Sequence, residues 1–257
     1  MTTDTYEIIT VNADNLGDYP QAICFINPKN EYYNLKIAWL KKQFKKGLVI
    51  KLLKLKQTKK IIGFIEYLPG EEAWRAVNAI DYLFIHCLWV SPNKNRLHGL
   101  GTVLIEEALK DAKKIKKSGV AVITSNGPFM AKKELFVKNG FEVVEEFSNF
   151  QLFAKKFAAK NNSPKLIINQ DKLKQYQDWH IIYSKQCPWV ARFVEEVKPI
   201  LQQKKIKINV TEIDSAKAAQ SAPGIYSVFN LIKDGQLLAD RYISITRFLN
   251  IIKKEDL

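Results

Sequence analysis

A long apolar run at residues 80–90 is the feature of this 257-residue sequence that most limits how it can fold. The run contains aromatic and branched side chains and stops at Ser91-Pro92, which is typical of a strand buried on both faces. After a polar loop, residues 100–115 place apolar side chains on one stripe of a helix. A strand with two buried faces needs neighbours on both sides, so the sequence predicts a sheet with helices packed on it.

The first 157 residues continue this alternation of strands and helices. Their order is strand, helix, three strands, helix, strand, helix and two strands, which predicts an α/β (α+β) fold with a mixed sheet and flanking helices. The strands are expected at residues 6–11, 48–55, 61–68, 80–90, 120–124, 142–147 and 150–155, and the helices around residues 33–44, 100–115 and 130–138.

A polar stretch at residues 155–164 separates two well-patterned regions and ends in Ser163-Pro164. Few apolar side chains occur there, so we place a domain boundary in it. We expect one domain at residues 1–157 and a smaller α/β domain at residues 165–257.

Charge, cysteine spacing and hydropathy argue against several classes of protein. The net charge is +14, but the basic side chains are mostly lysines spread along the chain, so a solvated surface is favoured over nucleic-acid binding. Cys24, Cys87 and Cys187 lie far apart without paired spacing, and we expect no metal site. No apolar run could span a bilayer and the polar start is unlike a signal peptide, so we expect a cytoplasmic protein without membrane contacts.

Two glycines, Gly99 and Gly101, stand where the helix after the long strand begins. Backbone N–H groups at a helix N-terminus attract anions, and glycine lets an anion approach the backbone closely. The segment therefore predicts a pyrophosphate site. A Rossmann site would need a complete Gly-x-Gly-x-x-Gly and a Walker loop would need Gly-Lys-Ser/Thr, and this segment has neither.

The spacing Arg96-x-x-Gly99-x-Gly101 resembles the acetyl-CoA signature of the GNAT superfamily of N-acetyltransferases, Gln/Arg-x-x-Gly-x-Gly/Ala. Residues 135–141, which end in Gly140-Phe141, are similar to that family's later motif, and the resemblance covers residues 1–157.

The resemblance implies that acetyl-CoA is the cosubstrate and that the fifth strand parts from the fourth to leave a cleft for the thioester. Gly101→Glu should then abolish acetyl-CoA binding and leave the fold intact, because a side chain would intrude where the backbone meets the phosphate and its charge would repel it. By this resemblance, the main chain of Leu88, Trp89 and Val90 would contact the pantetheine, and Leu97, His98, Gly99, Leu100, Gly101 and Thr102 would bind the pyrophosphate, with Arg96 at the start of the loop.

His86 is the candidate general base, because His-x-Leu-x-Val resembles a strand end of arylalkylamine-type members, where a histidine serves as base. Imidazole suits the role since its pKa lies near neutrality, and a structural core histidine is the alternative. Where the family often has a tyrosine acid, this sequence has Phe136, which has no proton to donate. Cys87, Ser125 or a water would replace it, and Asn126 resembles a polar cofactor-binding residue after the fifth strand.

Residues 165–257 resemble the thioredoxin fold, and the whole chain resembles the YoaP-like bacterial proteins, in which a GNAT domain precedes a small YoaP-type domain. Val190 stands where a second cysteine would be, so Cys187 has no internal disulfide partner there. Its place before a helix that opens with Pro188 predicts a thiol pKa below the ordinary value. The resemblance implies a cis bond before Pro223, beside the thiol, and a cysteine buried for packing is the alternative.

Together these features predict an N-acetyltransferase that moves the acetyl group of acetyl-CoA to an amine of a small molecule by direct attack in a ternary complex. A CoA-binding protein with a monothiol redox or ligand-binding module is the first alternative. A polyanion-binding protein, suggested only by the charge, is the second.

Overall fold

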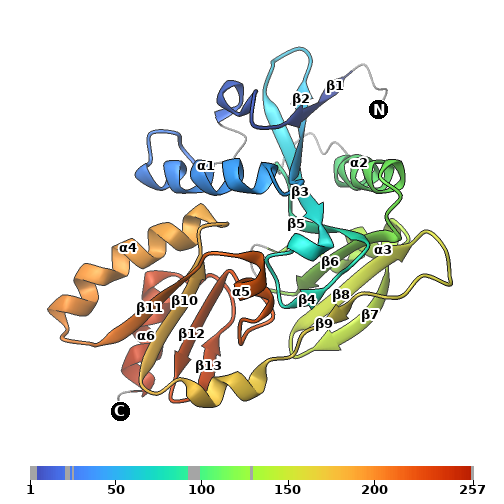
Figure 1. Cartoon of the computed structure of the whole chain (residues 1–257). Helices are drawn as coiled ribbons and strands as arrows, with labels where there is room; N and C mark the ends of the chain where they lie inside the picture. Colours follow the sequence, from blue (N-terminus) through green and yellow to red (C-terminus); the bar gives the residue numbers. More distant parts are fainter. Residues whose placement is uncertain (1–4, 21–23, 25, 92–98, 128–129, 256–257) are drawn as a thin grey trace. The chain divides into compact units, whose positions relative to one another are not determined.

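The computed structural model describes residues 5–20, 24, 26–91, 99–127 and 130–255 (Figure 1). The chain divides into two compact units. The first consists of Met1–Phe25, Leu40–Ala73 and Val77–Leu166, and the second of Ile26–Trp39, Trp74–Ala76 and Ile167–Leu257. Each unit has its own sheet, helices and buried core, so the expected α/β fold class is confirmed.

In the described part of the first unit, seven strands form one sheet. Every neighbouring pair is antiparallel except β5–β6, which is parallel. A parallel pair needs a crossover connection, and the chain between these strands contains a helix, α2 (Leu100–Lys114). The order across the sheet is β1 (Tyr6–Val11), β2 (Val49–Leu55), β3 (Ile61–Pro69), β5 (Tyr82–Val90), β6 (Gly119–Ser125), β8 (Phe150–Lys156) and β7 (Glu142–Phe147).

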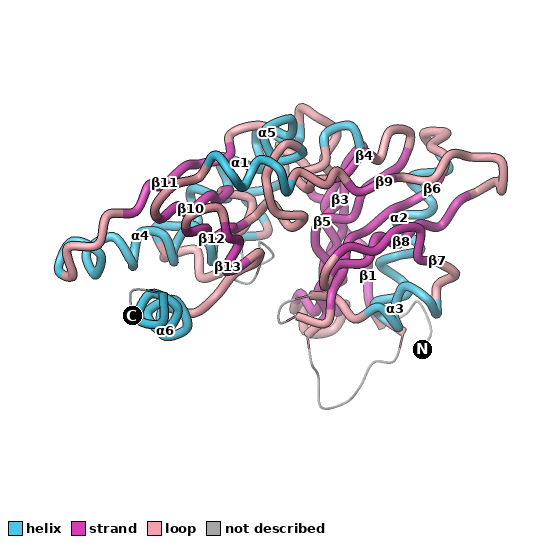
Figure 2. The backbone as a smooth tube through the Cα atoms, turned by 90° about the horizontal axis from the view of Figure 1, so that it is seen from below, coloured by secondary structure: helices cyan, strands magenta, loops and turns pink. Residues whose placement is uncertain are grey.

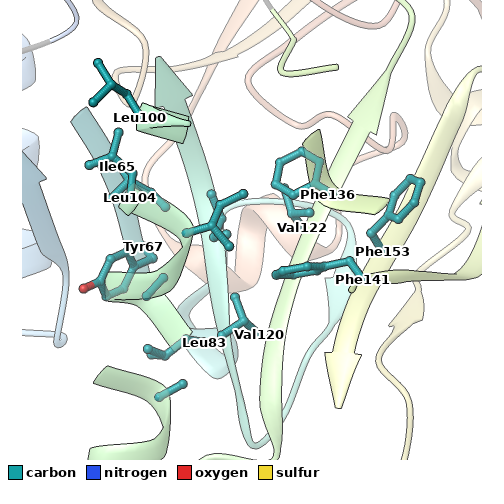
Figure 3. Close-up of a cluster of buried hydrophobic side chains, with 14 of the residues drawn as sticks. Ile65, Tyr67, Leu83, Leu100, Leu104, Val120, Val122, Phe136, Phe141 and Phe153 are labelled. Carbon is teal, nitrogen blue, oxygen red and sulfur yellow. The ribbon is translucent and has the colours of Figure 1, made fainter. Parts of the chain in front are cut away.

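The core of the first unit lies between one face of this sheet and α2 with α3 (Lys133–Lys138), as Figure 3 shows. The apolar stripe of α2 places Leu104, Ile105 and Ala108 there with no exposed surface. Burying one leucine or isoleucine side chain contributes about 1.5–3 kcal/mol, so this stripe fixes α2 on the sheet. Its strand partners include Ile65, Tyr67, Leu83, Ile85, Val120, Val122 and Phe153.

The expected strands and helices of the first unit are present, with ends shifted by a few residues. The β5 strand begins at Tyr82 rather than at residue 80, because Asp81 adopts a left-handed φ of 63° and Ile80 is 60% exposed. The Asp81 N–H donates to Glu71 Oε1 (3.0 Å), which stabilises this turn. Short elements that the pattern did not predict are η1 (Leu16–Asp18), η3 (Gly70–Glu72), and the paired strands β4 (Val77–Asn78) and β9 (Lys165–Leu166).

The second unit is built on a four-stranded sheet among its described residues. Its order is β11 (Ile208–Ile213), β10 (Trp179–Ser184), β12 (Phe229–Lys233) and β13 (Gln236–Ala239), with β10 and β11 parallel and the other neighbours antiparallel. Its helices are η4 (Gln170–Gln175), α4 (Pro188–Gln203), α5 (Ala216–Gln220) and α6 (Ile245–Glu255). One buried cluster joins α4 and α6 to β10 and β12, so these two helices cover the same face of the sheet (Figure 2).

Two segments from the first half of the chain belong to the second unit. One contains the start of α1 (Glu31–Phe44), whose Leu35 packs against the core of this unit. In the other, Arg75 is 2% exposed, donates from Nη1 to Gln186 Oε1 (2.5 Å) and stacks its guanidinium 4.0 Å from the Tyr226 ring. The Ala76 N–H also donates to Ile225 O (3.2 Å), so the segment is bound through both side chain and backbone.

The helices in the described part of the chain are short. None is long and apolar enough to cross a membrane. The longest, α4, has 16 residues, whereas a membrane span needs about 20 apolar ones.

Candidate functional site

The strands β5 and β6 pair over only a short distance. Their parallel register runs from Tyr82↔Gly119 to Ile85↔Val122, although β5 continues to Val90 and β6 to Ser125. Beyond Ile85, β5 keeps its pairing with β3 and β6 keeps its pairing with β8. On the edge of β5 that faces β6, residues 86–90 therefore lie beyond the register of the parallel pair. Main-chain groups on this edge can pair with an extended ligand.

A β-bulge lies at this point in β5. Glu66 pairs with Cys87 while Tyr67 pairs with Ile85, so His86 is an extra residue in β5. Leu83, Ile85, Leu88 and Val90 all contact the core cluster on the α2 face. Two residues separate Ile85 from Leu88, and both His86 and Cys87 consequently lie on the opposite face, with Trp89.

Ser125 reaches the same face of the sheet from β6. Val120 and Val122 lie in the core cluster, so by strand alternation Ser125 faces the other way. It is 6% exposed, and its Oγ accepts from the Gly127 N–H (3.2 Å). The structure thus brings the three predicted catalytic residues, His86, Cys87 and Ser125, to one face near the point where β5 and β6 part. The predicted cofactor residue Asn126 follows directly and is exposed.

The His86 side chain has no exposed surface, and its Nδ1 lies 3.5 Å from Glu66 Oε1. The Glu66 side chain is 2% exposed, and the Phe84 ring stands edge-on to the imidazole with centroids 5.8 Å apart. Sequence analysis did not bring Glu66 and His86 together. Their register across the β3–β5 pair could have suggested it, but the bulge shifts that register by one residue.

The predicted pyrophosphate residues fall partly outside the described chain, because Arg96, Leu97 and His98 lie there. Gly99 is the N-cap of α2 and has a φ of 93°, a conformation that glycine adopts without strain. A Cβ at this position would meet no atom within 4 Å. The first helical bond runs from the Val103 N–H to Gly99 O, so the preceding N–H groups of the first turn lie where a helix leaves donors available.

Gly101 packs closely against a side chain of α3. A Cβ there would lie 3.0 Å from Leu135 Cδ1 and 3.1 Å from Leu135 Cδ2. The missing side chain therefore leaves room for Leu135 of α3, and the expectation that a side chain at 101 leaves the fold intact stays a prediction. The other residues of this turn are also tied to the unit, since Leu100 is buried and Thr102 Oγ1 accepts from Asn139 Nδ2 (3.2 Å).

Comparison with known proteins gives the family of one part of the chain. Residues 16–141 match the model of the acetyltransferase (GNAT) family. The chain contains a GNAT-family acetyltransferase domain. It is also 29% identical, over 252 residues, to a Bacillus subtilis (strain 168) protein named "Uncharacterized N-acetyltransferase YoaP", with 95% of this chain and 97% of that protein covered.

Solved structures also match part of the chain. One is PaiA N-acetyltransferase from Thermoplasma acidophilum in complex with coenzyme A, with 17% identity, 60% of this chain and 99% of that chain covered, and a TM-score of 0.39. Another is Arabidopsis thaliana NAA60 in complex with acetyl-CoA, with 17% identity, coverage of 60% and 99%, and a TM-score of 0.42.

In this GNAT domain, Phe136 is a core residue. It has no exposed surface and packs against Phe141 and Phe153, with ring centroids 5.7 and 6.3 Å away (Figure 3). The tyrosine in the same cluster, Tyr67, donates its hydroxyl to Asp111 of α2 (2.6 Å). Burial, and next the Asp111 carboxylate, raise the pKa of Tyr67 well above its usual range, so this hydroxyl keeps its proton.

Cys187 is the N-cap of α4 and is followed by Pro188 at the first helical position. The expected lowering of its thiol pKa is wrong in sign, because burial raises the pKa. The N–H groups of Val190 and Trp189 and the charges of Lys36 and Arg75 act in the opposite direction without outweighing burial.

The predicted cis bond before Pro223 is also wrong, since none of the described peptide bonds is cis. A trans bond before proline is favoured by about 0.5–1 kcal/mol in general. Here Ala222 O accepts from Asn169 Nδ2 (3.0 Å) and the Gly224 N–H donates to Asn230 Oδ1 (3.2 Å), one bond on each side of Pro223.

We predict that Gly101→Val destabilises the protein by about 1–3 kcal/mol, because overpacking forces Leu135 from its place. In a Leu135→Ala background the same substitution should cost much less, since the clashing methyl groups are gone. Thermal unfolding of the four proteins in this double-mutant cycle measures the coupling. Equal losses of stability in both backgrounds would contradict the packing role of Gly101.

We predict that Cys187 reacts slowly with iodoacetamide at neutral pH. Its raised pKa leaves the thiol protonated there, and the rate should increase only as the pH rises above the ordinary thiol range. Mass spectrometry of the labelled peptide, with the protein unfolded in denaturant as control, measures the rate. Native-state labelling at neutral pH as fast as in the unfolded chain would contradict this assignment.

Proposed function

We propose that this chain transfers the acetyl group of acetyl-CoA to an amine of a small molecule by direct attack in a ternary complex. The observation that carries the proposal is the parting of β5 and β6 after Ile85 and Val122. The two strands separate there beside three side chains that can exchange protons or hydrogen-bond, His86, Cys87 and Ser125. The match to the acetyltransferase family supports the same reaction.

The proposed cofactor site has two parts. The main chain of Leu88, Trp89 and Val90 would bind the amide groups of the pantetheine arm as an added strand does. The N–H groups at residues 99–102 would bind the pyrophosphate, because the start of a 15-residue helix carries partial positive charge. The left-handed φ of Gly99, with open space where a side chain would be, fits a close approach of an anion.

His86 is the proposed general base. A neutral amine attacks the thioester carbonyl, a C–N bond forms, and the C–S bond breaks with its electron pair leaving on sulfur. The proton of the amine goes to the imidazole of His86, and the thiolate takes up a proton. Since Phe136 lies in the core, the proposed sources of that proton are Cys87, Ser125 or a water.

For the second unit we propose a thioredoxin-like fold over residues 165–257, following the acetyltransferase domain at residues 1–157. The sheet order β11-β10-β12-β13 and the start of α4 directly after Cys187 support it. The similarity to the Bacillus subtilis protein extends over 95% of this chain, so the two share sequence in both units. The raised pKa of Cys187 argues against a redox module as the main function.

We predict that His86→Gln lowers the turnover number by about 10²–10⁴-fold, because the amine loses its base. Release of free CoA thiol, followed with a panel of small amines, measures turnover, and calorimetric titration measures acetyl-CoA affinity, which should not change. An unchanged turnover number would contradict the assignment of His86 as the general base. Tight binding of acetyl-CoA by the wild-type chain with no turnover on any amine would favour the CoA-binding alternative.

We predict that Gly99→Ala weakens acetyl-CoA binding at least tenfold. Alanine at a φ of 93° is strained by about 1–3 kcal/mol, so the start of α2 should shift and misplace its N–H groups. Gly17→Ala is the matched control, because a Cβ there also meets no atom within 4 Å and its φ is not left-handed. Equal affinities of the two variants, measured by calorimetry, would speak against a pyrophosphate site at Gly99.

A further inference from the structure

Glu66 occupies an unusual position for a carboxylate. It stands in the middle of β3, where the seven residues from Ile62 to Leu68 are all buried, and it is 1% exposed. Glutamate is almost never fully buried without a partner, because a carboxylate removed from water costs several kcal/mol. One charged group beside Glu66 is the imidazole of His86, whose Nδ1 lies 3.5 Å from Glu66 Oε1, within the distance of a charge contact.

Two glutamates in η3, the short helix directly after β3, show the contrast. Glu71 accepts from Lys117 Nζ (2.8 Å) and Glu72 pairs with Lys46 Nζ (3.0 Å), and each of these carboxylates is 31% or more exposed. They are surface ion pairs of the kind that contributes little. Glu66 instead faces a titratable group in a buried environment, where a charge acts strongly on its neighbour.

A carboxylate beside an imidazole influences which ring nitrogen carries the proton. A neutral imidazole carries its proton on one nitrogen and a lone pair on the other. A carboxylate beside Nδ1 favours the proton on Nδ1, which leaves the lone pair on Nε2. When Nε2 then takes a proton, the resulting imidazolium is positive and the same carboxylate stabilises it.

We propose that Glu66 is a positioning residue for His86, whose carboxylate holds the proton on Nδ1 so that Nε2 carries the lone pair that takes the proton of the amine. The proposal rests on the role of His86 as base. Glu66 itself neither touches the substrate nor exchanges a proton in this assignment. The bulge that makes His86 the extra residue of β5 brings its ring beside Glu66.

The test compares Glu66→Gln, which keeps the shape and removes the charge, with Glu66→Asp, which keeps the charge. We expect Glu66→Gln to lower kcat by about 10–100-fold, as loss of an orienting partner does elsewhere, with little change in KM for acetyl-CoA. Glu66→Asp should recover part of the rate. In a His86→Gln background, Glu66→Gln should have no further effect, because the two residues act as one unit.

A spectroscopic measurement separates this role from a merely structural one. The ¹⁵N chemical shifts of the His86 imidazole report which nitrogen is protonated, and the chain has only three histidines, so His86→Gln assigns the signal. We expect the Nδ1–H form to predominate in the wild-type protein and to decrease in Glu66→Gln. Glu7→Gln is the matched control, since Glu7 pairs with Lys54 at the far edge of the same sheet.

The outcomes test the role of His86 as base and the role of Glu66 as positioning residue separately. If His86→Gln keeps full activity, the proposed base is wrong whatever Glu66 does. If His86→Gln loses activity while Glu66→Gln retains wild-type kcat and imidazole shifts, the role of Glu66 is overturned and that of His86 stands. Unchanged acetyl-CoA affinity and circular dichroism show that each variant is folded, and if Glu66→Gln fails this check, Glu66→Asp decides through its kcat and its shifts.

Discussion

The short parallel pairing of β5 with β6 is the constraint on which the first unit depends. A parallel pair cannot be closed by a hairpin, so the chain must cross over, and it does so through α2. The crossover helix buries its apolar stripe on one face of the sheet, which fixes the core. Because the pairing ends at Ile85 and Val122, it also leaves the ends of both strands apart, and the proposed acetyl transfer takes place there.

The β-bulge in β5 determines which side chains lie where β5 and β6 separate. Without the extra residue, strand alternation would turn either His86 or Cys87 toward the α2 core. With it, both lie on the face that Ser125 shares, and His86 meets the buried carboxylate of Glu66. Bulges often re-aim side chains beside active sites, and the position of this one agrees with such a role.

The second unit shows how segments distant in sequence can share one core. Leu35 and Arg75 come from the first half of the chain, yet both pack within the unit that contains Cys187. Burial in this unit outweighs the cations and N–H groups that would favour a thiolate, so the Cys187 thiol is protonated at neutral pH. A helix start alone therefore does not determine the chemistry of a cysteine placed before it.

The sequence by itself determined the alternation of strands and helices, the glycine at position 99 where α2 begins, and Pro188 at the start of α4, because periodicity and helix starts are local properties of the chain. Only the tertiary structure decided the contact of Glu66 with His86, the packing of Gly101 against Leu135, and the sign of the pKa shift of Cys187. These depend on register between strands and on burial by distant segments, and no local pattern encodes either one.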